Sequence, residues 1–176
     1  MTFPRRSVGC AGGACRRSYR NALRTATSAI AMLLVVACGS AGAPGGRELS
    51  LQVVADGQFA HVQAPSLSIA VTDIDRTRLS ILAGKPLGGE LLIAIFMGER
   101  STGGYAVRVD GASVAGSEVR VRGSFLGPPP GGIVTQVITS PFAIASIDRS
   151  QLPTGQTTFV FVDGGTILAR AEVVLP

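Results

Sequence analysis

The sequence predicts an all-β fold, mainly antiparallel, built as a small β-sandwich or a partly open barrel. Apolar and polar residues alternate in many short runs, which is the pattern of half-buried strands. Asp-Gly pairs at residues 56–57, 110–111 and 163–164 interrupt these runs, and such pairs favour hairpin turns. The 23 Gly and 10 Pro residues supply turns for many short elements.

The first half of the predicted domain starts with a strand near residues 49–54, which a turn at 56–57 would join to a second strand at 58–63. Residues 73–83 (DIDRTRLSILA) have some helical character, with Asp73 as a possible cap, so we expect an irregular connection or a short helix. Residues 91–97 (LLIAIFM) are apolar throughout, which indicates a strand buried on both faces.

The second half is predicted to consist of strands and hairpins. Alternation at residues 105–110 and 119–122 indicates two strands with one buried face each. Residues 133–138 and 142–147 are further strand candidates, separated at Ser140-Pro141. Residues 159–162 and 166–174 frame a last hairpin at Asp163-Gly164.

The N-terminal residues 1–37 have the parts of a secretion signal. Six arginines and no acidic residue precede Cys38, and Ala29–Ala37 (AIAMLLVVA) is unbroken and apolar. Nine residues suit the apolar part of a signal peptide, whereas a membrane-spanning helix needs about 20. Arg16-Arg17 faintly resembles a twin-arginine export signal, although ordinary positive charge explains it better, and the export route stays open.

Cys38 is the predicted lipidation site. It follows Val35-Val36-Ala37 and precedes Gly39-Ser40, which resembles the lipobox of bacterial lipoproteins. Two or more acyl chains, such as palmitate, would anchor the chain stably to a membrane. The alternative is a small buried cysteine at the end of an uncleaved helix. We expect residues 38–47 to be a flexible tether and residues 48–176 to be one β domain on the extracytoplasmic face of the membrane.

Charge and cysteine content limit the function classes of the mature chain. From Cys38 onward 10 basic residues face 11 acidic ones, so the high pI comes from the leader and we expect no nucleic-acid partner. Cys10 and Cys15 would be lost with the leader, which leaves no cysteine for a disulfide or a thiolate metal site. We predict no cofactor and no metal site.

No set of residues matches a catalytic motif. His61 is the only histidine, and we expect it on a strand as a structural or exposed residue. The GASVAG stretch around Ser113 has the spacing GxSxxG and lacks the strand-turn-helix pattern of a nucleophile elbow. Asp73 and Asp75 form a DxD pair that Arg76 and Arg78 would neutralise. We therefore predict that the protein is not an enzyme.

Residues 127–132 (GPPPGG) are predicted to form a stiff, exposed loop. Pro128, Pro129 and Pro130 have fixed φ angles and favour an extended polyproline II segment. A stiff loop loses little entropy on binding, so it suits recognition. A rigid connection between two strands explains the same residues, and both interpretations stay open.

The apolar strand at residues 91–97 runs into GERSTGGY (residues 98–105), and the proline turn and TQVITSPF (residues 135–142) follow it. With these motifs in this order, residues 91–147 resemble the PrcB C-terminal domain of bacterial protease complex subunit PrcB and similar lipoproteins. Phe142 departs from the tyrosine that is more frequent in the family, and the triple proline is richer than usual. Both departures leave the binding specificity open.

The resemblance implies a lipid-anchored accessory protein of a surface protease complex. Our first hypothesis is a non-enzymatic binding module for another exported protein. The candidate contact residues are Thr102, Gly103, Gly104, Tyr105, Pro128, Pro129, Pro130, Thr135 and Gln136. The alternative is an extracellular protease inhibitor that presents residues 127–132, and a hydrolase is the least favoured class.

Overall fold

The computed structural model describes residues 46–88 and 91–176. The predicted signal peptide, Cys38 and most of the predicted tether lie outside these residues. The described chain forms two β-sheets and one helix in the order β1 (Arg47–Leu49), β2 (Leu51–Gly57), β3 (Ser66–Ala70), α1 (Asp73–Ala83), β4 (Leu91–Phe96), β5 (Ala106–Ala115), β6 (Glu118–Leu126), β7 (Phe142–Ile147), a 3-10 turn (Arg149–Gln151), β8 (Gly155–Asp163) and β9 (Thr166–Leu175).

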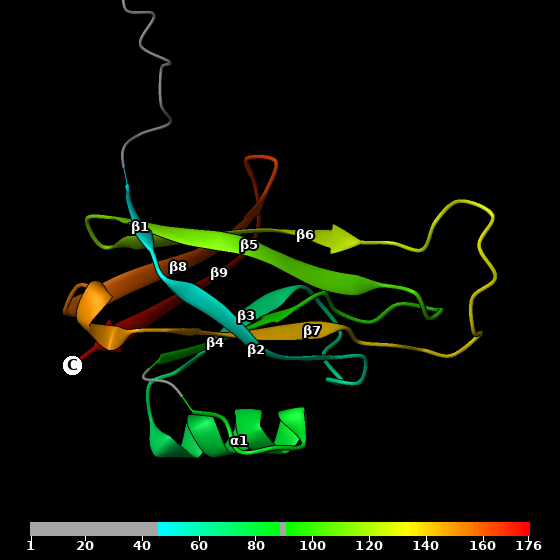
Figure 1. Cartoon of the computed structure of the whole chain (residues 1–176), viewed down its shortest axis with the longest axis horizontal. Coiled ribbons are helices and arrows are strands. Elements are labelled where there is room, and N and C mark those ends of the chain that lie inside the picture. The colour runs from blue at the N-terminus through cyan, green and yellow to red at the C-terminus, as the bar shows by residue number, and fades with distance from the viewer. Residues whose placement is uncertain (1–45, 89–90) are drawn as a thin grey trace, which may run out of the picture. The chain divides into compact units, whose positions relative to one another are not determined.

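The two sheets stack as a sandwich, and α1 covers the outer face of the smaller sheet (Figure 1). The five-stranded sheet has the order β1-β5-β6-β8-β9 and the four-stranded sheet the order β2-β7-β4-β3. All neighbouring strands of the described chain are antiparallel except β6 and β8, which are parallel. The predicted all-β, mainly antiparallel fold is therefore confirmed, as a sandwich and not as a closed barrel.

Strand β4 lies at the centre of the fold and is buried along its whole length. Its odd residues Leu91, Ile93 and Ile95 face the five-stranded sheet and pack in a core with residues such as Phe159 and Phe161. Its even residues face α1 in a second core that includes Leu79 and Phe142. The unbroken apolar run at 91–97 thus has the physical cause that the sequence predicted: both faces of this strand are covered.

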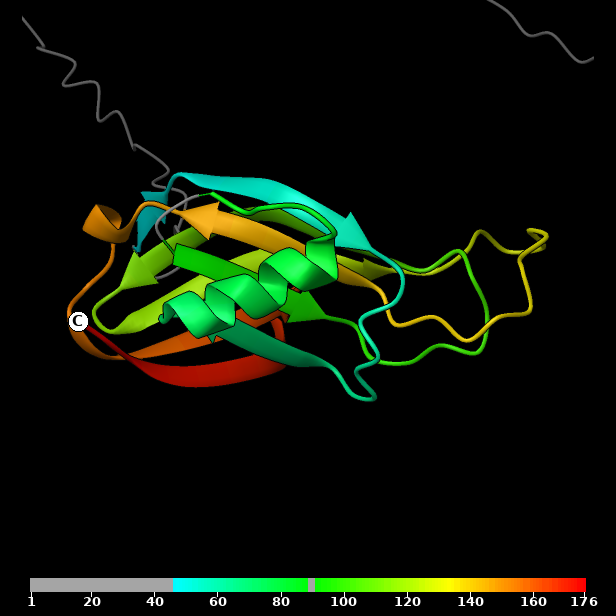
Figure 2. The ribbon, with the colours of Figure 1, turned by 90° about the horizontal axis from the view of Figure 1, so that it is seen from below.

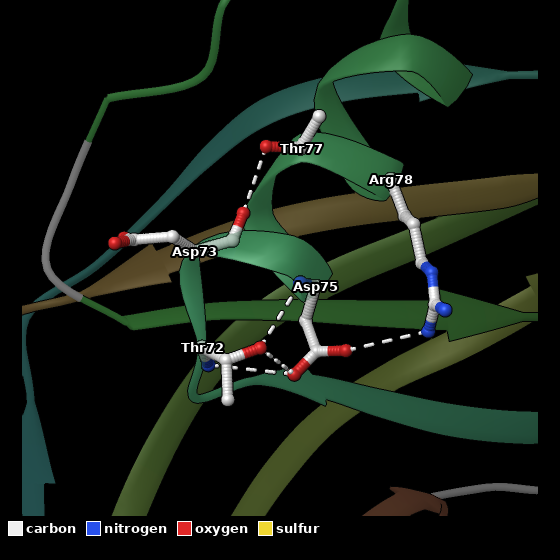
Figure 3. A network of polar contacts seen from close by, with 5 residues as sticks. All are labelled: Thr72, Asp73, Asp75, Thr77 and Arg78. Carbon is white, nitrogen blue, oxygen red and sulfur yellow. Dashed lines mark hydrogen bonds and ion pairs between the residues drawn. The ribbon is translucent and has the colours of Figure 1, made fainter.

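The helix α1 is regular, although the sequence left open an irregular connection. Asp73 does not cap it; Thr72 does, because its hydroxyl accepts a hydrogen bond from the Asp75 N–H at 3.2 Å (Figure 3). The Asp75 carboxylate reaches back to the Thr72 N–H at 3.4 Å and to the Arg78 guanidinium at 3.7 Å. This capping box, with Gly84 at φ 66° as the C-terminal cap, offsets the weak helical propensity.

Two of the three predicted Asp-Gly hairpins are wrong. Asp56-Gly57 ends β2 and pairs with β7, and a Cβ on Gly57 would lie 2.6 Å from the Phe142 ring. Asp110-Gly111 lies inside β5 at a bulge. In both places glycine serves close packing or a bulge rather than a turn. The third hairpin, between β8 and β9, is confirmed, with positive φ at Gly164 and Gly165.

Two further strand predictions are wrong. Residues 58–63 form a loop apart from an isolated bridge between Phe59 and Ser140. His61 in this loop is exposed and has φ 56°, so it is not on a strand. Residues 133–138 form no strand either, since no strand of the described chain lies beside them to pair with. In the described part of the chain no helix is long and apolar enough to cross a membrane.

Candidate functional site

Two loops extend together beyond one end of the sandwich (Figures 1 and 2). The first, residues 98–105, joins β4 to β5, and the second, residues 127–139, joins β6 to β7. We call these two segments the arm. All predicted contact residues lie on the arm, so the structure brings together two elements that are far apart in the sequence.

Backbone hydrogen bonds tie the two segments of the arm at its base. The N–H of Arg100 donates to the Thr139 carbonyl at 2.7 Å, and the N–H of Thr139 donates to the Arg100 carbonyl at 2.9 Å. The buried Thr139 hydroxyl donates to the Thr102 carbonyl at 2.8 Å. Ser140, also buried, exchanges hydrogen bonds with the backbone of Val62 at 2.9 and 3.0 Å. These bonds fix where the arm leaves the sandwich.

The glycine pair of the arm allows the two segments to touch. The Gly103 N–H donates to the Thr135 carbonyl at 2.9 Å, and a Cβ on Gly103 would overlap the Thr135 hydroxyl. Gly104 has φ 86°, and a Cβ there would lie 3.0 Å from Pro128. A side chain at either position would therefore push the second segment away.

Tyr105 is the last residue of the first arm segment and directly precedes β5. Its carbonyl accepts a hydrogen bond from Gln58 Nε2 at 2.9 Å, and the Arg100 guanidinium lies 5.8 Å from its ring centroid, in the range of a cation–π contact. Arg100 also donates to the Met97 carbonyl at 3.1 Å. Met97, Arg100, Tyr105, Phe125 and Gly127 line a small hollow at the base of the arm.

The proline segment turns back at the end of the arm. The Gly132 N–H donates to the Pro129 carbonyl at 2.9 Å, and Gly131 has φ 74°. Proline followed by a glycine with positive φ is the signature of a type II turn. The flanking glycines thus close a tight turn at this end of the segment, and the extended conformation predicted for the three prolines stays a prediction. Pro129 and Pro130 are exposed on this turn.

Three large apolar side chains on the arm are exposed, which the sequence did not lead us to expect. Ile133 is fully exposed, and Val137 and Ile138 are 44% and 66% exposed. The sequence indicates residues 133–138 only as a strand candidate and does not mark these side chains as exposed. The absence of any charged residue between Arg122 and Asp148 could have indicated this segment as a surface for apolar contacts. Within the arm, only Glu99 and Arg100 carry charge, so it offers apolar contacts and neutral hydrogen-bonding groups.

Four ion pairs lie away from the arm, on the outer face of the five-stranded sheet. Ion pairs of 2.7 to 2.8 Å join the arginines and carboxylates there: Arg108 to Asp110, Arg120 to Glu118, Arg122 to Glu48, and Arg170 to Glu172. The hydrogen bond from Arg122 lowers the pKa of Glu48. In the described residues no group of three or more His, Cys, Asp or Glu side chains could hold a metal ion.

The comparisons with known proteins give one family match. Residues 91–148 match the family model described as PrcB C-terminal, which covers about a third of the chain. The matched segment runs from β4 through both parts of the arm to the end of β7. No curated protein and no solved structure matches the chain. The resemblance stated from the sequence is confirmed over these residues.

Proposed function

We propose that this protein is a lipid-anchored, non-enzymatic accessory protein that uses the arm to bind another exported protein, in or near a protease complex. The family match supports an association with a protease-related complex. The observation that carries the binding role is the exposure of Ile133, Val137 and Ile138 on the matched segment. Grouped, exposed aliphatic side chains indicate an interaction surface.

The attachment that we propose is a lipid on Cys38. The sequence between Cys38 and Gly46 is short and rich in small residues, so it would hold the domain close to the membrane on the extracytoplasmic face. Eight residues can span at most about 29 Å when fully extended. This distance keeps the arm within reach of other proteins at the membrane surface.

The arm is suited to binding because hydrogen bonds order its base while most residues beyond the base are exposed. Hydrogen bonds at Arg100, Thr102 and Thr139 order the base before any partner arrives, which reduces the entropy lost on binding. The neutral side chains of Thr135 and Gln136 lie exposed beside the aliphatic residues. A partner with an apolar patch and neutral hydrogen-bonding groups would match this surface.

The alternative, a protease inhibitor, draws support from the exposure of Pro129 and Pro130 at the end of the arm. Inhibition by a bait loop requires backbone that lies extended in a protease cleft. The hydrogen bond between Gly132 and Pro129 closes a turn at that place. This geometry favours the accessory role over the inhibitor.

The lipid anchor is tested by metabolic labelling with an alkyne analogue of palmitate. We expect label on the wild-type protein and none on Cys38→Ser, together with release of the variant from membranes. Label that persists on the variant would contradict the anchor.

The binding role is tested by comparing an arm variant with a helix variant in a pull-down. Replacing Ile133, Val137 and Ile138 with serine should abolish recovery of a partner and lower the amount of the associated protease. The matched control replaces Ile74 and Ile81, which are 66% and 76% exposed on α1, with serine. Equal recovery with both variants would refute the arm as the binding site, and a protease that is blocked by the domain would support the inhibitor instead.

A further inference from the structure

The segment at residues 133–138 (IVTQVI) combines a strand-like sequence with unpaired backbone. Five of its six residues are Ile, Val or Thr, which are enriched in strands. In the described part of the chain its six backbone N–H groups donate no hydrogen bond within the protein, and only the Thr135 carbonyl accepts one, from Gly103. The segment therefore has the composition of a strand, but the described chain offers it no partner strand.

We infer that this segment pairs as an antiparallel strand with the same segment of a second copy of the chain. This pairing requires neither the lipid anchor nor the protease partner of the proposed function. The second copy's own segment 133–138 occupies the unpaired backbone of the arm.

Charge and shape favour a second copy as the occupant. A two-fold axis places identical residues near one another, so a charged segment would repel its own copy. No charged residue occurs between Arg122 and Asp148, and the segment is therefore free of this repulsion. The arm extends beyond the strands of the sandwich, so two arms could meet while the sandwiches stay apart (Figure 2).

Self-pairing also gives matched side chains. If the axis passes through Thr135, Ile133 lies opposite Val137 of the other copy on one face, and the two Thr135 residues face each other. Aliphatic and Thr–Thr pairs across neighbouring strands stabilise a sheet. A pair of short strands alone is marginal in water. We therefore expect a weak, reversible dimer whose ribbon leaves its side chains free for a further partner.

Disulfide trapping tests this inference. The parent is the full chain with Cys10, Cys15 and Cys38 replaced by serine, which removes every native cysteine. Single cysteines are then placed at each of residues 133–138, and cells are oxidised mildly before electrophoresis without reductant. Only the residue on the axis meets itself, so disulfide formation should peak at Thr135→Cys or Gln136→Cys and fall several-fold two residues away.

Two controls separate strand pairing from chance collision. Ile81→Cys on α1, which is 76% exposed, should give no more dimer than the parent. In the Thr135→Cys chain, Gln136→Pro should abolish the dimer, because proline lacks the N–H that would face the second copy. Gln136→Ala keeps that N–H and should leave the dimer unchanged.

Three results would overturn the inference. The first is dimer formation at Thr135→Cys and Gln136→Cys no faster than at Ile81→Cys. The second is equal trapping with proline and alanine at residue 136. The third is a trapped species whose mass differs from twice that of the chain, which would assign the arm to another protein while leaving the proposed accessory role intact.

Discussion

Replacing Gly123 with alanine should destabilise the whole domain, because the added methyl group has no space. Gly123 lies in β6 opposite Val109 of β5. A Cβ there would overlap the Arg108 carbonyl oxygen and would lie 2.7 and 2.9 Å from two carbons of the Phe161 ring. Ordinary contacts of a Cβ begin at about 3.4 Å.

Neither neighbour of this methyl group can move freely. The Arg108 carbonyl belongs to the backbone of β5, and the Phe161 ring is fully buried and lies 5.3 Å from the Phe125 ring centroid. Overpacking of a core costs about 1–3 kcal/mol, occasionally more. Two clashes at one site place Gly123→Ala at the upper end, so we expect a loss of about 3 kcal/mol in the free energy of unfolding.

Urea denaturation of Gly123→Ala and of Gly127→Ala measures this difference. Gly127 is a suitable control because the nearest atom to its added Cβ is in the Tyr105 ring, at 3.6 Å. We expect Gly127→Ala to stay within about 0.5 kcal/mol of the wild type. If the two variants unfold at the same urea concentration, the packing argument for Gly123 is wrong.

Three further predictions concern the helix, the pH dependence and the arm. Thr72→Ala removes the N-cap of α1 and should lower the free energy of unfolding by about 0.5–2 kcal/mol, and an unchanged melting temperature would contradict the capping role. The hydrogen bond from Arg122 lowers the pKa of Glu48 in the folded state, so this pair stabilises the fold above the pKa of an unfolded glutamate and loses its effect as the pH falls through the lowered value. Glu48→Gln should therefore flatten the acid side of the profile of unfolding free energy against pH. Profiles of identical shape for the variant and the wild type would refute this. Gly103→Ala should loosen the arm, because the added methyl group would overlap Thr135, and the backbone amide at position 103 should then exchange its hydrogen faster than in the wild type. Adding Thr135→Ala should restore slow exchange. If the double variant exchanges as fast as the single variant, the overlap is not the cause.

Several elements followed directly from local sequence. The apolar run at 91–97 predicted a strand buried on both faces, and β4 is that strand. The turn at Asp163-Gly164 predicted the last hairpin, because two consecutive glycines at 164–165 accept the positive φ that it needs. The order of apolar strand, TGGY, proline turn and TQVITSPF predicted the family match that residues 91–148 show.

Other elements depended on neighbours that the sequence does not specify. Asp56-Gly57 has the residues of a hairpin, but β2 continues along β7 and the glycine makes room for Phe142. Residues 133–138 have the composition of a strand, yet strand formation requires a second strand with free backbone groups. No strand of the described chain lies beside this segment, and Ile133, Val137 and Ile138 are exposed on the arm.

The sequence by itself determined the fold class, the strand at the centre of the sandwich and the grouping of the predicted contact residues in one family segment. The tertiary structure decided which strands pair, where α1 packs and that two distant loops form one arm. The physical reason is that apolar periodicity and turn residues act over a few neighbouring positions. Strand pairing and exposure depend on contacts between residues far apart in the chain, such as Gly103 with Thr135.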